Sequence, residues 1–203
     1  SEAAAFAYVL YMQGRDVYFG VNPRAGFGGK KGNIEYLCAF HAEIDYGRDG
    51  HKKESLWQSY EEAYEAILSF DPAPSIVIHS GGGFHVYWPI EDPIRVKDVG
   101  VDVLEAINKE LSTKIGGDKG TQDLSRVLRI PGSSNFKIPG NPRRVTLEEN
   151  THKKFIFADF MEFIPSELLQ SKNANANSGY DIDSLHVSGR VKNLIRYGND
   201  GTY

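Results

Sequence analysis

The segment FHAEID (40–45) closes an apolar run, YLCAFHAEID (36–45), whose pattern decides the predicted fold. Successive side chains of a strand point to opposite faces. The side chains predicted to face the core are Phe40, Ala42 and Ile44. Those predicted to face the other way are His41, Glu43 and Asp45. Two adjacent carboxylates repel each other unless a cation lies between them. Glu43 and Asp45 are therefore candidate metal ligands, and a solvent-facing strand end is the simpler alternative.

The composition is that of an ordinary globular protein. The 203 residues suffice for one large domain or two small ones, and the net charge of −4 gives no general basic character. Any contact with nucleic acid must therefore come from a local patch. Cys38 is the only cysteine, which excludes internal disulfides and a cysteine-rich zinc site.

The start of the chain does not resemble a signal peptide. No apolar run approaches the roughly 20 residues that span a bilayer, and SEAAAFAYVLYMQG (1–14) lacks a basic n-region. We expect a cytoplasmic protein without membrane contact. SKNANANSG (171–179) is a linker by composition. We therefore expect a catalytic domain over 1–170, then a linker and the start of a C-terminal helical element over 171–203, in a protein that continues further.

The central elements follow in the order strand, helix, strand, strand, helix. Apolar residues at helical spacing predict a helix over 56–69, and β-rich runs flanking three glycines predict a hairpin over 75–90. A second helix is predicted over 95–115. This order is that of ferredoxin-like or RRM-like layers. The predicted fold class is α+β, a mixed α/β architecture with an RRM-like catalytic sheet, flanking helices and an N-terminal α/β part.

Other segments complete the predicted domain. The start of the chain predicts a short helix, and DVYFGVN (16–22), VLRI (127–130) and RRVTLEE (143–149) are strand-like. FIFADFMEFIPSELL (155–169) is apolar enough to close the core.

The hairpin turn, SGGGFH (80–85), has the chemistry of a phosphate site. Backbone N–H groups from Ser80 to Gly83 can approach a phosphate because the glycines carry no Cβ. His85, expected on the exposed face of the following strand, can donate to a phosphate oxygen. A glycine run at a hairpin is by itself usually only a turn.

The segment TQDLSRVLRIPGSSNFK (121–137) concentrates charge. Asp123 supplies a third carboxylate, while Arg129 and Lys137 can neutralise phosphates. Carboxylates favour hard divalent ions such as Mg²⁺ or Mn²⁺. The three motifs together therefore predict a nucleoside triphosphate held by metals.

In this order, the motifs EID (43–45), SGGGFH (80–85) and DLSRVLRIPGSSNFK (123–137) resemble the catalytic domain of the archaeo-eukaryotic primase superfamily. More narrowly, they resemble the primase-polymerases of plasmids, phages and CRISPR-associated operons. The resemblance covers about residues 16–150, and RVLRIPGSSNFK is its most specific part. It implies synthesis of primers and extension of DNA on a single-stranded template, from NTPs or dNTPs, by a two-metal mechanism.

The resemblance also implies a role for each matched residue. The implied catalytic residues and metal ligands are Glu43, Asp45 and Asp123. The implied nucleotide-binding residues are Ser80, Gly82, His85, Arg126, Arg129, Asn135 and Lys137. The first motif of the family is usually Asp-x-Asp, so Glu43 is a departure. Many relatives carry a zinc-binding element, and this chain, with a single cysteine, does not.

The implied partners are a single-stranded DNA template, NTPs or dNTPs, and a helicase or CRISPR adaptation or replication proteins bound through the region after residue 203. Initiation also requires a second basic pocket for the triphosphate of the first nucleotide. Its candidate residues are Arg24, Lys30, Lys31, Lys52, Lys53, Arg143 and Arg144.

Two other kinds of protein fit parts of this pattern. A metal-dependent nuclease would use the carboxylates but needs no cradle for a free triphosphate. A non-catalytic, RRM-like module for single-stranded nucleic acid would need no metal. A rolling-circle initiator is disfavoured because His79 and His85 do not form a His-x-His pair.

Overall fold

The computed structural model describes residues 2–26, 28–47, 55–168 and 192. Within these ranges, a four-stranded antiparallel sheet forms the centre, in the order β2-β4-β3-β8. Its strands are β2 (Tyr36–Asp45), β3 (Ile76–His79), β4 (Gly83–Arg95) and β8 (Thr146–Asn150). The predicted run 36–45 is therefore a strand over its whole length, and the predicted hairpin is β3 followed by β4.

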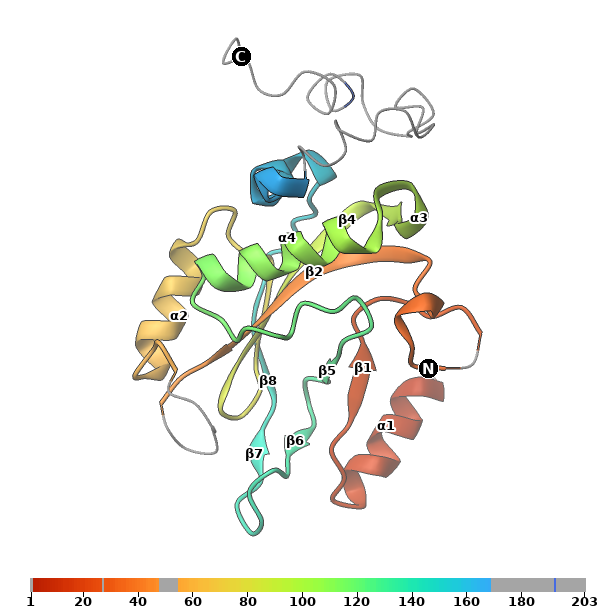
Figure 1. The fold of residues 1–203 in the computed structure, drawn as a ribbon. Helices are drawn as coiled ribbons and strands as arrows, with labels where there is room; N and C mark the ends of the chain where they lie inside the picture. Colours follow the sequence, from red (N-terminus) through yellow and green to blue (C-terminus); the bar gives the residue numbers. More distant parts are fainter. Residues whose placement is uncertain (1, 27, 48–54, 169–191, 193–203) are drawn as a thin grey trace.

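Helices cover one face of this sheet (Figure 1). They are α2 (Tyr60–Ser69), α3 (Val96–Val99), α4 (Val101–Lys114) and the 3₁₀ segment η2 (Phe157–Phe163). The main core lies between them and the sheet, and its sheet side includes Phe40, Ala42 and Ile44, which are at most 1% exposed. The predicted inward face of the first strand is thus confirmed. Phe155, Phe160 and Phe163 close this core, as expected for the apolar segment 155–169.

Two short ribbons cover the opposite face of the sheet. One pairs β1 (Tyr18–Gly20) with β5 (Val127–Arg129), and the other pairs β6 (Ser134–Asn135) with β7 (Arg143–Arg144). A second, smaller core lies beneath them and consists of Ile78, Tyr87, Leu128 and Val145. In Figure 1 these ribbons extend together below the sheet, beside the N-terminal helix α1 (Glu2–Met12).

The boundaries of three predicted elements differ for local reasons. The helix predicted over 56–69 begins at Tyr60, because the side chain of Ser59 accepts the N–H of Glu62 and caps it. The helix predicted over 95–115 is divided at Gly100, whose φ of 99° ends α3. The strand predicted over 143–149 is two strands, β7 and β8, with different partners.

The outer edge of β2 is closed by side chains and a loop instead of another strand. Asn22 Oδ1 accepts the N–H of Cys38, and Asn108 Oδ1, from α4, accepts the N–H of His41. The N–H of Asp118 donates to the carbonyl of Glu43 at 2.8 Å. These bonds pair backbone N–H and C=O groups along the edge of β2, which could otherwise pair with a strand of another chain. They also fix the loop after α4 against the acidic end of β2.

The predicted linker and C-terminal element at 171–203 lie outside the described residues, apart from Lys192. None of the helices that the structure describes combines the length and the apolar character needed to cross a bilayer.

Candidate active site

A polar cavity of about 210 Å³ lies where β2 ends and β4 begins. Its lining comprises Glu43, Asp45, Ser80, Gly81, Gly82, His85, Asp118, Arg129, Asn135, Lys137, Ile138, Asn141 and Arg143. The cavity thus brings together all of the predicted site residues except Asp123 and Arg126. We call it the carboxylate pocket.

The antiparallel register of β2 and β4 places the first two motifs side by side. Glu43 lies opposite His85, and Asp45 lies opposite Gly83. A Cβ on Gly83 would stand 2.7 Å from Asp45 Oδ1 and 2.6 Å from the carbonyl oxygen of Ile44. Glycine is therefore required at this position so that the Asp45 carboxylate can lie against the turn.

The glycine turn is held from within, by Asn135 of the third motif and by Arg143 of β7. Ser80 donates both its N–H, at 2.7 Å, and its hydroxyl, at 3.0 Å, to the carbonyl of Gly83. Asn135 Nδ2 donates to the Ser80 carbonyl at 2.9 Å, and Arg143 Nη1 donates to the Gly81 carbonyl at 3.0 Å. The expectation that the Ser80 N–H faces a phosphate is therefore wrong in this structure, because the turn itself uses that donor.

His85 lies beneath the pocket and is only 4% exposed. The expectation of an exposed strand face at this position is wrong, because this face of β4 is covered: Tyr87, two residues along the strand, shares a buried cluster with Leu128 of β5. Burial, followed by the neighbouring charges of Arg129 and Arg126, lowers the pKa of His85 to about 3. The ring is thus neutral at pH 7, with Nε2 3.9 Å from Glu43 Oε2 and a buried Nδ1 that has no partner among the described residues.

Arg126 holds the carboxylate of Glu43. Its Nε and Nη2 lie 2.6 Å and 2.5 Å from Glu43 Oε1. Burial raises the pKa of Glu43, Arg126 opposes that rise, and the charges of Asp45 and Asp118 add to it. Burial is therefore the main cause of the raised pKa, and Arg126 outweighs the like charges of Asp45 and Asp118.

The third predicted carboxylate lies behind Arg126. Asp123 Oδ2 is 3.9 Å from Arg126 Nη1, and Asp123 Oδ1 accepts the hydroxyl of Ser125 at 2.9 Å. Asp123 does not line the carboxylate pocket, whereas Asp118 does. Arg126 thus stands between Glu43 and the Asp123 side chain.

The basic residues of the third motif differ in how firmly they are placed. Arg129 Nε donates to Asp16 Oδ1 at 2.9 Å, and its guanidinium lies 5.2 Å from the centre of the Tyr18 ring. Lys137 is exposed, and its backbone N–H donates to Asn135 Oδ1. Asp16 and Tyr18 therefore hold Arg129 in one orientation, while Lys137 lines the pocket as an exposed residue.

The donor set suits a hard divalent cation. Three carboxylates, those of Glu43, Asp45 and Asp118, line one pocket, and two of them raise the pKa of the third. Among the described residues, no group of three or more His, Cys, Asp or Glu side chains is already close enough to hold a metal ion. Ion binding would therefore require side-chain rearrangement, first of all at the Arg126–Glu43 pair.

Several residues at this site were missed or left unassigned by the sequence patterns. Asp118 follows a Gly-Gly pair that signals only a helix end, and Asp16 lies far from every motif. A Cβ on Gly117 would stand 2.6 Å from the Glu43 carbonyl, so this glycine lets the Asp118 loop approach β2. No local sequence pattern distinguishes residues that make such contacts from other polar residues in loops.

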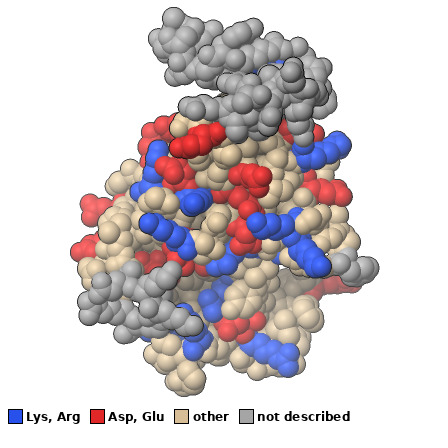
Figure 2. Space-filling view, in the orientation of Figure 1, with Lys and Arg blue, Asp and Glu red and all other residues tan. Residues whose placement is uncertain are grey.

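The candidates for a second basic pocket are dispersed. Arg143 lines the carboxylate pocket and an adjoining one, which Arg144 also lines. Arg24 instead donates to the Ser125 carbonyl, and Lys31 pairs with Glu105 at 2.6 Å. Lys30 is exposed and lines neither pocket, and Lys52 and Lys53 lie outside the described residues. Figure 2 shows acidic and basic side chains intermixed on one face of the molecule, in line with the small net charge.

Comparison with known sequences yields one curated relative. No family model matches the chain. Over 108 residues it is 30% identical to a replication protein of Clostridium perfringens, a match that covers 52% of this chain and 25% of that protein. The chain therefore spans about a quarter of the length of this relative.

Comparison with solved structures finds primase domains. The AEP domain of the cyanophage S-2L primase-polymerase matches with a TM-score of 0.57 and 21% identity, covering 79% of this chain and 76% of that one. Primase RepB′ matches with a TM-score of 0.52 and 16% identity, covering 87% and 52%. The catalytic domain of RepB′ in complex with initiator DNA matches with a TM-score of 0.52 and 15% identity, covering 88% and 78%. At these identities the likeness is one of fold.

Proposed function

We propose that this chain, which has the fold of archaeo-eukaryotic primase-polymerase domains, is a template-directed nucleotidyltransferase that makes primers and extends DNA on a single strand. The observation that carries the proposal is the convergence of Glu43 and Asp45 with the glycine turn and two cations, Arg129 and Lys137, in one pocket. Carboxylates beside a set of cations fit a triphosphate whose charge is shared between metal ions and side chains.

The proposed metal ligands are Glu43, Asp45 and Asp123, with Asp118 as a further pocket carboxylate. Asp123 can join them once Arg126, now 3.9 Å from its carboxylate, leaves Glu43. Bound Mg²⁺ or Mn²⁺ would lower the pKa of an attacking 3′-hydroxyl and stabilise the departing pyrophosphate. Zinc is not expected, because the site offers oxygen ligands and Cys38 does not line it.

The chain's own residues position and neutralise the nucleotide. Arg129, oriented by Asp16, and Lys137 would contact phosphate oxygens, and Arg126 would do so after leaving Glu43. The turn at Ser80–Gly82, with Asn135 bonded to it, would form one wall of the phosphate site. His85, which is neutral at pH 7 and lines the same pocket, would contact a phosphate oxygen of the nucleotide.

The relatives support a role in DNA replication. One is named a replication protein, and another is a primase solved with initiator DNA. A single-stranded DNA template is therefore the proposed partner. Backbone contacts and base stacking would make its binding salt-dependent and tolerant of sequence.

The decisive experiment supplies an unprimed single-stranded template, Mn²⁺ and a mixture of ribo- and deoxyribonucleotides. Template-dependent products longer than one nucleotide support the proposal, and their loss on chelation of the metal tests its metal dependence. Shortening of the template would instead indicate a nuclease. A non-catalytic binding module would give two results together. The wild type would synthesise nothing, and replacing Glu43, Asp45 and Asp123 with Ala would leave the affinity for the template unchanged.

A further inference from the structure

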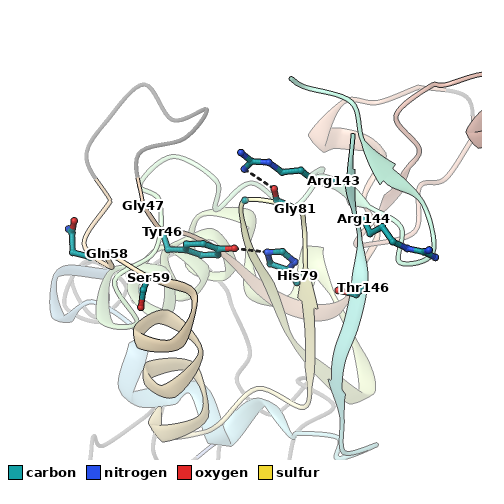
Figure 3. A pocket seen from close by; sticks show the side chains of 10 residues that line it. Tyr46, Gly47, Gln58, Ser59, His79, Gly81, Arg143, Arg144 and Thr146 are labelled. Atoms are coloured by element: carbon teal, nitrogen blue, oxygen red, sulfur yellow. Dashed lines mark hydrogen bonds between the residues drawn. The ribbon is translucent and has the colours of Figure 1, made fainter. Parts of the chain in front are cut away.

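The arginines at the carboxylate pocket are held by different kinds of group. Arg126 pairs with the carboxylate of Glu43, a proposed metal ligand. Arg143 donates from Nη1 to the carbonyl of Gly81, which holds it against the glycine turn (Figure 3). The first of these contacts competes with a metal ion for its ligand, whereas the second leaves the carboxylates untouched.

Arg129 lines the carboxylate pocket, yet the carboxylate that it pairs with does not. Its Nε donates to Asp16 Oδ1 at 2.9 Å, and Asp16 is not among the residues of the pocket wall. Both side chains are largely shielded from water, with 15% of Arg129 and 27% of Asp16 exposed. Solvent and salt screen such a pair less than one at the surface. An acidic residue outside the pocket thus determines where one of its cations lies.

The pairing of β1 with β5 places Asp16 beside Arg129. Tyr18 lies directly opposite Arg129 in this ribbon, and the N–H of Ile130 donates to the carbonyl of Val17, which continues the ladder. Residues two apart in an extended chain share a face, so Asp16 and Tyr18 lie on the same side. The centre of the Tyr18 ring is 5.2 Å from the guanidinium of Arg129. The guanidinium is therefore held by a carboxylate and a ring together.

Asp16 also anchors the second half of the third motif. The same oxygen, Oδ1, accepts the N–H of Phe136 at 3.2 Å. The residue before it, Asn135, donates to the Ser80 carbonyl of the glycine turn. An asparagine in place of Asp16 would still accept the N–H of Phe136, but it would lose the negative charge that holds Arg129. The two roles of this carboxylate can therefore be separated by one substitution.

Arg129 is close enough to the proposed metal ligands to be attracted by them. It lines one pocket with Glu43 and Asp45. Burial raises the pKa of Tyr18, Arg129 opposes that rise, and the charges of Asp16 and Glu43 add to it, so these three charges all act on one ring. Without the charge of Asp16, the guanidinium would be drawn toward the carboxylates of the pocket.

We propose that Asp16 is a positioning residue, which keeps Arg129 in place for a nucleotide phosphate and prevents it from pairing with the carboxylates that bind metal. This inference rests on the proposed function, because it concerns the same pocket. A metal ion then competes with one arginine, Arg126, instead of two, and Arg129 stays available to a phosphate oxygen.

The test is the effect of Asp16→Asn on metal binding. Electron paramagnetic resonance titration of free Mn²⁺, without nucleotide, should give a Kd raised about fivefold or more, because Arg129 now competes for the carboxylates. In the double variant Asp16→Asn/Arg129→Gln the Kd should return to within about twofold of wild type. Asp159→Asn, which alters another acceptor of a backbone N–H outside the pocket, is the matched control and should leave the Kd unchanged.

Primer extension at saturating Mn²⁺ gives a second readout. Asp16→Asn should raise the KM for the incoming nucleotide about tenfold and change kcat much less, because a phosphate contact is misplaced. The melting temperature should stay within a few degrees of wild type.

Two results would overturn the inference. One is an unchanged Kd for Mn²⁺ together with an unchanged KM in Asp16→Asn, which would leave Asp16 with a structural role alone. The other is weaker Mn²⁺ binding that the additional Arg129→Gln change does not relieve. A wild type that binds no Mn²⁺ would refute this inference together with the proposed metal site. The expected Mn²⁺ affinities in a protein that makes no product on any template would refute the proposed function alone.

Discussion

Arg126 contacts the Glu43 carboxylate through two nitrogens at 2.6 Å and 2.5 Å, and it also lies 3.9 Å from Asp123. A cation from the third motif thus occupies the position where the first motif would bind a metal. Arg126 neutralises part of the acidic cluster, and under the proposed function it would have to release Glu43 for a metal ion to bind there.

Replacing Arg126 should therefore separate metal binding from catalysis. In Arg126→Gln we expect Mn²⁺ to bind severalfold more tightly, because a competing cation has gone, while kcat falls because a phosphate contact is lost. Electron paramagnetic resonance titration of free Mn²⁺ measures the first effect, and steady-state primer extension the second. Weaker Mn²⁺ binding in this variant would show that Arg126 supports the metal site.

The acidic residues of β2 should be needed for turnover and not for folding. We expect Asp45→Asn to lower kcat by at least about a hundredfold, since a lost metal ligand removes transition-state stabilisation. The melting temperature should stay within a few degrees of wild type. Asp92→Asn, at an exposed acidic position on the same sheet and outside the pocket, is the matched control. A residual activity of one tenth or more would remove Asp45 from the ligand set.

The third carboxylate can be identified by a pair of variants. Because we propose Asp123 as the ligand, Asp123→Asn should raise the Kd for Mn²⁺ about tenfold or more. Asp118→Asn, which alters a residue that already lines the pocket, should raise it by less than about threefold. The opposite order would assign the third ligand to Asp118 and leave Asp123 as the partner of Arg126.

The close approach of Gly83 to β2 gives a prediction about stability. Gly83→Ala would place a methyl group 2.6 Å from the Ile44 carbonyl oxygen and 2.7 Å from Asp45 Oδ1. We expect a loss of about 1–3 kcal/mol in the free energy of unfolding, together with reduced activity. Gly29→Ala, where nothing lies within 4 Å, is the control and should be nearly neutral. Equal urea midpoints for the two variants would contradict the tight packing of the turn.

The buried His41 should make the fold sensitive to acid. Its Nε2 lies 3.1 Å from the Thr121 carbonyl, and burial lowers its pKa from 6.5 to about 4. The unfolded chain therefore takes up a proton at a higher pH than the folded one, so stability is full above pH 6.5 and falls as the pH drops toward 4. At pH 5 the loss is about 2 kcal/mol by linkage.

His41→Gln should show a smaller loss of stability than wild type between pH 7.5 and pH 5. Thermal melting of both proteins at the two pH values measures this difference. Because both proteins contain His85, whose pKa is also lowered, its similar contribution cancels in the comparison. An identical pH dependence of stability in the two proteins would show that His41 accepts a proton in the folded state without leaving its site.

Local sequence patterns were sufficient to predict most of the helices and strands. The alternation in 36–45 predicted the strand and its buried face, and the glycines at 81–83 predicted the hairpin that follows α2. The same alternation placed His41 on the outward face but could not predict that it is 1% exposed, because the cover comes from a loop eighty residues later in the chain.

The amino-acid sequence shows which residue types are available: the carboxylates, the glycine turn and the cations of the third motif are short-range patterns with a direct chemical meaning. Which of these residues meet depends on the folded arrangement of the chain. Arg126 stands between Glu43 and Asp123, Asp118 enters the pocket, and Asp16 orients Arg129. Such contacts join residues far apart in the chain, and they depend on how the loop after α4 and the β1–β5 ribbon pack against the sheet, which no local spacing encodes.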